Sequence, residues 1–139
     1  MHYKMRDQIR FKIGKEEKNI QEKWIEIPEG TEHIQMMIEM PEEFRYMAFL
    51  FLEDPKKEIR FQKLLGYGQQ NPGIGKSTKD TTIGGVPGEI YPGTWKIGIG
   101  IFTEYVAQKL GEQTGEIVLT VSDRKDVVSD PIGGECWGE

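Results

Sequence analysis

The fold of this chain is decided by residues 83–102, which read IGGVPGEIYPGTWKIGIGIF. The stretch begins with two glycines, turns at Pro87-Gly88 and again at Pro92-Gly93, and then continues as a long alternating segment. Period-2 alternation places the large apolar residues of that segment on one face of a β-strand; they are Trp95, Ile97, Ile99 and Ile101. The pattern predicts a core strand with Trp95 as its anchor.

Similar short apolar or alternating runs, each closed by turn residues, occur on both sides of this stretch. They cover residues 9–13, 24–27, 33–40, 47–52, 59–65 and 115–122. About eight short strands with turn signals every 8–12 residues or so are typical of an antiparallel sandwich or barrel. We expect an all-β fold, an antiparallel β-sandwich that is jelly-roll-like, as a single domain over residues 1–122 with a polar C-terminal tail at 123–139.

Three segments carry weaker signals. Residues 66–82 form the longest stretch without a confident element, with a short strand suggested at 77–83. Residues 103–114 read as a loop in which 106–110 make one helical turn. Residues 47–52, MAFLFL, are apolar on both faces, which indicates either a central strand covered on both sides or a strand at a subunit contact.

Composition excludes several functional classes. The longest apolar run is far shorter than the roughly 18 residues of a membrane span, and the N-terminus lacks the apolar core of a signal peptide. A single cysteine, Cys136, excludes an internal disulfide framework, so we expect a cytoplasmic protein without membrane contact. The net charge of −5, from 18 basic and 23 acidic residues, argues against a nucleic-acid partner.

The motifs that carry chemistry in other proteins are incomplete in this one. Gly75-Lys76-Ser77 resembles the end of a phosphate-binding loop, but Gln70 stands where the first glycine is needed. Two histidines and one cysteine do not make a zinc cluster, and the acidic residues near the C-terminus lack the spacing of a calcium loop. We therefore expect no metal site, no cofactor and no catalytic residue.

Aromatic residues are the best candidates for a binding site. Tyr67, Tyr91 and Tyr105 fall in or beside expected loops, and Phe102 falls on the strand face opposite Trp95. Exposed rings stack on sugars or contact protein partners. Our candidate ligand-binding residues are Tyr67, Tyr91, Phe102 and Tyr105, although loop tyrosines are also ordinary structural residues of a sandwich.

Residues 81–102 resemble part of the N-terminal β-sandwich domain that precedes the catalytic domain of PHP-type metal-dependent hydrolases, which are phosphoesterase-like. The residues that carry the resemblance are Thr82, Gly84, Pro87, Gly88, Gly93, Trp95, Gly100 and Phe102. A patterned likeness extends over residues 20–122 or so. The glycine segment after the central strand departs from the family, and the His-x-His that opens the family's catalytic domain is absent.

The resemblance implies a non-catalytic accessory or binding domain. Its partner would be a carbohydrate, a portion of a substrate or a protein, contacted through the loops at residues 66–82 and 103–114, because loops on a rigid sandwich often carry function. The alternative is a structural dimerisation module, which the apolar run at residues 47–52 favours. A lower alternative is a small hydrolase that uses loop carboxylates such as Asp80, Glu89 and Glu104.

Overall fold

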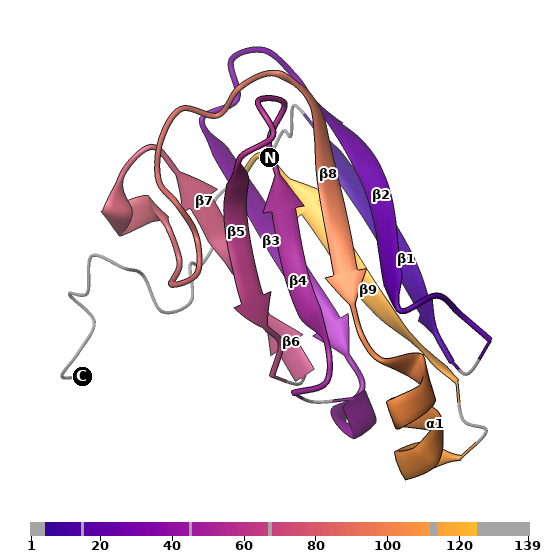
Figure 1. Ribbon diagram of the computed structural model, residues 1–139. Helices are drawn as coiled ribbons and strands as arrows, with labels where there is room; N and C mark the ends of the chain where they lie inside the picture. Colours follow the sequence, from indigo (N-terminus) through magenta and orange to yellow (C-terminus); the bar gives the residue numbers. More distant parts are fainter. Residues whose placement is uncertain (1–4, 15, 45, 67, 112–113, 125–139) are drawn as a thin grey trace, which may run out of the picture.

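The computed structural model describes residues 5–14, 16–44, 46–66, 68–111 and 114–124. These residues form two antiparallel β-sheets packed face to face, which confirms the predicted all-β sandwich (Figure 1). The predicted tail beyond residue 124 lies outside the described residues.

The first sheet has the strand order β1-β9-β3-β6, with β7 also paired to β3. Its strands are β1 (Arg6–Ile13), β9 (Gly115–Ser122), β3 (His33–Met40), β6 (Gly68–Gln70) and β7 (Gly73–Gly75). The short strands β6 and β7 keep one continuous register along β3, because Gln70 pairs with Ile38 and Gly73 pairs with Gln35. They therefore occupy one strand position that is interrupted at Asn71-Pro72.

The second sheet has the order β2-β8-β4-β5. Its strands are β2 (Ile20–Ile27), β8 (Gly93–Gly100), β4 (Phe49–Glu53) and β5 (Ile59–Leu64). When β6 and β7 count as one position, the eight positions in chain order are arranged 1-8-3-6 in one sheet and 2-7-4-5 in the other. This is the order of a jelly roll, in which nearly every connection crosses from one sheet to the other.

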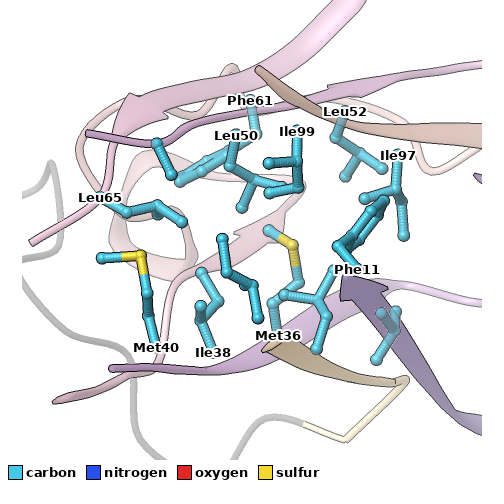
Figure 2. Close-up of a cluster of buried hydrophobic side chains, with 14 of the residues drawn as sticks. Phe11, Met36, Ile38, Met40, Leu50, Leu52, Phe61, Leu65, Ile97 and Ile99 are labelled. Carbon is cyan, nitrogen blue, oxygen red and sulfur yellow. The ribbon is translucent and has the colours of Figure 1, made fainter. Parts of the chain in front are cut away.

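The core lies between the sheets, where the alternating residues of both inner faces meet (Figure 2). Leu50, Ile97 and Ile99 from the second sheet pack there with Phe11 and Ile38 from the first. Each of these side chains is essentially inaccessible to solvent. Burial of this apolar surface is the main favourable contribution to folding, at about 25 cal/mol per Å².

Strand β8 confirms the alternation predicted from the sequence. Trp95 is fully buried, and its indole N–H donates a 2.7 Å hydrogen bond to the carbonyl oxygen of Tyr91. The strand ends at Gly100, one residue before the last predicted inward residue, Ile101, which is nevertheless buried. Trp95 is therefore the core anchor that the sequence predicted.

Two segments differ from the sequence-based predictions. Residues 66–82 contain β6, β7 and the short 3₁₀ helix η2 (Thr78–Asp80), so the strand suggested at 77–83 is wrong. The hydroxyl of Thr82 accepts the Gly73 N–H at 2.7 Å, which fixes β7 against the segment that follows it. Residues 103–110 form a helix, α1 (Thr103–Leu110), longer than the single turn predicted.

The apolar run at residues 47–52 is covered on one face only. Leu50 and Leu52 point into the core, whereas Phe49 is exposed and Phe51 is half-buried on the outer face. Strand β4 is central in its sheet, as predicted, but no other described segment covers its outer face as a layer. The 3₁₀ helix η1 (Glu42–Phe44) precedes β4, at the end of the sandwich where α1 follows β8 (Figure 1).

Candidate functional site

A straight row of residues crosses the outer face of the second sheet at its α1 end. Ile20 of β2 pairs with Gly100 of β8, Gly100 pairs with Phe49 of β4, and Phe49 pairs with Leu64 of β5. We call these four residues the apolar row. The side chains of Ile20, Phe49 and Leu64 expose 60%, 40% and 50% of their surface, respectively. At about 4.8 Å between neighbouring strands, the row extends over about 14 Å.

The floor of this row is open at Gly100. A Cβ atom placed there would find only the carbonyl oxygen of Phe49, at 4.0 Å. At Gly98, one row further along β8, a Cβ atom would overlap the Phe51 ring. The ring of Phe51 therefore fills the space above Gly98, whereas the space above Gly100 is empty.

Phe102 stands beside the row and is the most exposed large apolar residue of the described chain, at 73%. Asn19 fixes the backbone on both sides of it. The Ile101 N–H donates to the Asn19 carbonyl oxygen at 2.8 Å, and the Thr103 N–H donates to Asn19 Oδ1 at 2.9 Å. The second bond also satisfies a free N–H group in the first turn of α1. The exposed ring is thus carried on a fixed backbone.

Together these residues line a groove of about 430 Å³. We call it the apolar groove; its lining residues are Asn19, Ile20, Met47, Phe49, Leu64, Gly100, Ile101 and Phe102. None of the described side chains in this lining is charged. A second hollow of about 450 Å³ shares Met47 with the groove and has two glutamates, Glu42 and Glu43, in its lining.

The same sheet face becomes charged further from α1. Lys96 Nζ lies 3.1 Å from Glu53 Oε1 and 3.2 Å from Glu22 Oε2. Hydrogen bonds to the carboxylates of Glu53 and Glu22 raise the pKa of Lys96 above its ordinary value. Trp24, which pairs with Lys96 across β2 and β8, exposes 60% of its surface beside this cluster. The face therefore has an apolar end and a charged end.

The opposite end of the sandwich is closed by a buried arginine. Arg60 donates to the carbonyl oxygens of Val86 and Glu89 and lies 3.4 Å from Asp54 Oδ2. Asp54 Oδ1 in turn accepts the N–H groups of Lys56 and Glu58 in the β4–β5 turn. These bonds attach the segment before β8 to the edge strand β5, which is a structural task.

The sequence-predicted binding residues do not form one site. Phe102 lies in the apolar groove, just after β8, and Tyr105 is half-exposed on α1. Tyr91 precedes β8, at the other end of an eight-residue strand, and is half-buried with Lys56 Nζ 4.1 Å from its ring centre. Tyr67 lies outside the described residues. The structure instead places Phe102 with three residues that sequence reasoning did not select, Ile20, Phe49 and Leu64.

The predicted loop residues have local partners. Lys76, the lysine of the incomplete phosphate loop, lies 3.8 Å from Glu32 and 3.7 Å from Glu89.

Within the described ranges, no group of three or more His, Cys, Asp or Glu side chains is placed to hold a metal ion. No helix in the part of the chain that the structure describes is long and apolar enough to cross a membrane.

Comparison with known proteins adds no relative to this picture. No protein-family model matches the chain, and no curated protein matches it significantly. Any assignment of function therefore depends on the groove and on the sequence resemblance alone.

Proposed function

We propose that this chain is a non-catalytic binding domain that contacts an apolar protein surface through the apolar groove. The observation that carries the proposal is the exposed apolar row, with the open space above Gly100 and the fixed ring of Phe102 beside it. An apolar patch of a few hundred Å², the size of the largest patch on a typical monomeric protein, is often functional.

A protein partner fits this groove better than a sugar. Sugar-binding sites need hydrogen-bonding groups beside the stacking ring, whereas the described part of the groove lining offers one polar side chain, Asn19. Phe102 projects outward instead of lining an enclosed cavity. A projecting, well-positioned aromatic side chain surrounded by apolar contacts is typical of a protein-interface hot spot.

The resemblance to the accessory domain of PHP-type metal-dependent hydrolases supports a place beside such an enzyme. Gly100 and Phe102, two of the residues that carry the resemblance, belong to the apolar groove. We propose that the chain serves as an accessory domain and leaves hydrolysis to a separate catalytic domain. Phosphoester hydrolysis by the purified chain with added Mn²⁺ or Zn²⁺, abolished by a chelator, would contradict this.

A peptide selection tests the binding surface without knowledge of the natural partner. Random peptides displayed on phage are selected on the immobilised chain at a concentration too low for self-contact, then compared on the Leu64→Glu and Gln62→Glu variants. Gln62 is the matched control because it is exposed on the same strand and face as Leu64, one row away.

We expect enriched peptides to be apolar and to bind the wild type and Gln62→Glu equally. Their affinity for Leu64→Glu should fall by about tenfold or more, because a charge in the groove must be desolvated on binding. Peptides that bind both variants alike, or no enrichment at all, would overturn the assignment of the surface.

A further inference from the structure

We propose that the partner of the apolar groove is a second copy of this chain, joined through the same groove on both subunits. This inference rests on the proposed function, because it names the occupant of that surface. It is carried by the shape of the groove, its area, its charge and the state of the sheet edges.

The groove is complementary to itself. A two-fold dimer brings the same surface patch of both subunits together, so the patch must contain both a projecting group and a space that accepts it. Phe102 projects with 73% of its surface exposed, and the space above Gly100 is empty in the same groove. A two-fold axis through the groove therefore lets each Phe102 ring cover Gly100 of the other subunit.

The exposed area matches a modest dimer. The exposed apolar side chains of the groove are Ile20, Phe49, Leu64 and Phe102, each of them 40–73% exposed. At about 150 Å² for each fully exposed side chain of this size, these four residues present roughly 350 Å² of apolar surface per copy. Two copies bury about 700 Å² through these residues alone, which is the size of a weak, transient interface.

The charges of the face permit this contact. Among the residues that the structure describes, no charged side chain lines the groove, so these residues of two copies meet there without opposed like charges. Glu22 and Glu53 lie further along the face, where both are paired with Lys96. An apolar centre with charges at its rim is the usual anatomy of a protein interface.

Two copies could also associate if a strand of one copy paired with an edge strand of the other. The edges of the same sheet are unsuited to that contact. The edge of β5 is covered, because the Gln62 N–H donates to the Gly84 carbonyl and the Val86 N–H donates to the Arg60 carbonyl. On β2, Lys23 faces the space between the sheets, with its Nζ 5.9 Å from the centre of the Phe11 ring. A strand added beside β2 would bury that charge, which is a recognised protection of edge strands.

Sedimentation velocity of two single-residue variants tests the contact directly. Phe102→Ala removes the projecting ring, and Gly100→Phe fills the space that accepts it. Each variant alone should dimerise at least about tenfold more weakly than the wild type, because a truncated hot spot and an overfilled pocket both cost affinity. An equimolar mixture should recover dimers, since each subunit then supplies what the other lacks.

Thermal unfolding of each variant establishes that it is folded before the mixture is analysed by sedimentation velocity. If Gly100→Phe does not fold, Gly100→Leu replaces it. Recovery of dimers in the mixture supports the inference. A wild type that stays monomeric up to millimolar concentration overturns it, as do variants that dimerise like the wild type or a mixture that stays monomeric. If monomers still bind the selected peptides through Leu64, the binding function stands and only the second copy is excluded.

Discussion

Both faces of the second sheet carry large apolar residues, but those residues are buried on the inner face and partly exposed on the outer face. Trp95 on β8 points into the sandwich and is fully buried, whereas Trp24 on the neighbouring strand points outward and is 60% exposed. Ile97 and Ile99 fill the core, whereas Gly100, which faces the other way, leaves open space on the outer face. The inner face therefore holds the fold together, and the outer face presents apolar surface that the monomer does not need.

On strand β8, the inward-facing residues contribute to stability, whereas the outward-facing residues at the apolar end contribute to binding. A substitution on the inner face should reduce stability, whereas a substitution at the apolar end of the outer face should reduce binding with little change in stability.

Trp95→Ala should destabilise the fold by about 3–5 kcal/mol, because it leaves a large cavity and removes the hydrogen bond to the Tyr91 carbonyl. That is a large fraction of the 5–15 kcal/mol or so of a typical domain. Urea unfolding followed by circular dichroism measures it. Trp24→Ala is the matched control and should change stability by less than about 1 kcal/mol. Equal losses in the two variants would break the division between the faces.

Gly98→Ala should destabilise the chain by about 1–3 kcal/mol, since the new methyl group would overlap the Phe51 ring and force it to move. Gly100→Ala, two residues along the same strand and face, should be within about 0.5 kcal/mol of the wild type, because its methyl group enters open space. Urea titrations of the pair measure the difference. A Gly100→Ala variant as unstable as Gly98→Ala would show that the groove floor is not open.

Asn19→Ala should cost about 1 kcal/mol, because the Thr103 N–H loses its acceptor in the first turn of α1. Dimer formation should weaken as well, since Phe102 is then less firmly positioned. Asn19→Asp keeps an oxygen at the same place and should stay close to the wild type in both respects. Urea unfolding and sedimentation velocity report the two effects. Loss of neither stability nor association in Asn19→Ala would contradict the positioning role.

Lys96→Met should have the smallest effect, and the effect should depend on pH. Glu53 and Glu22 raise the pKa of Lys96 in the folded chain, so its contribution to stability is complete below the unfolded pKa. The contribution is lost as the pH rises through the raised pKa. The stability difference between wild type and variant should therefore be constant from about pH 7 to pH 9 and shrink above about pH 10.5. A difference that grows with alkaline pH would reverse this sign.

Much of the fold could be predicted from the sequence. The strands at 33–40 and 115–122 have the predicted bounds, because long period-2 runs closed by turn residues leave little freedom. Strands β6 and β7 could not be predicted, since three residues rich in glycine carry no alternation and gain their pairing from β3. Helix α1 has eight residues, too few for a clear helical period.

Of the exposed apolar residues that form the candidate site, only Phe102 was predicted from the sequence. Phe102 was selected because it falls opposite Trp95 in an alternating strand. Its neighbours Ile20, Phe49 and Leu64 come from three other segments, and they meet only through the strand order 2-8-4-5. No local pattern contains that order. The apolar residues on both faces at 47–52 were the one signal of an exposed apolar sheet face.

The division between the faces is tested most directly by sedimentation velocity of Leu64→Glu beside Gln62→Glu, over a concentration range from micromolar to millimolar. We expect the wild type and Gln62→Glu to form dimers, whereas Leu64→Glu should stay monomeric and keep the thermal stability of the wild type. A Leu64→Glu variant that dimerises like Gln62→Glu would contradict the central claim that the apolar groove is the contact surface.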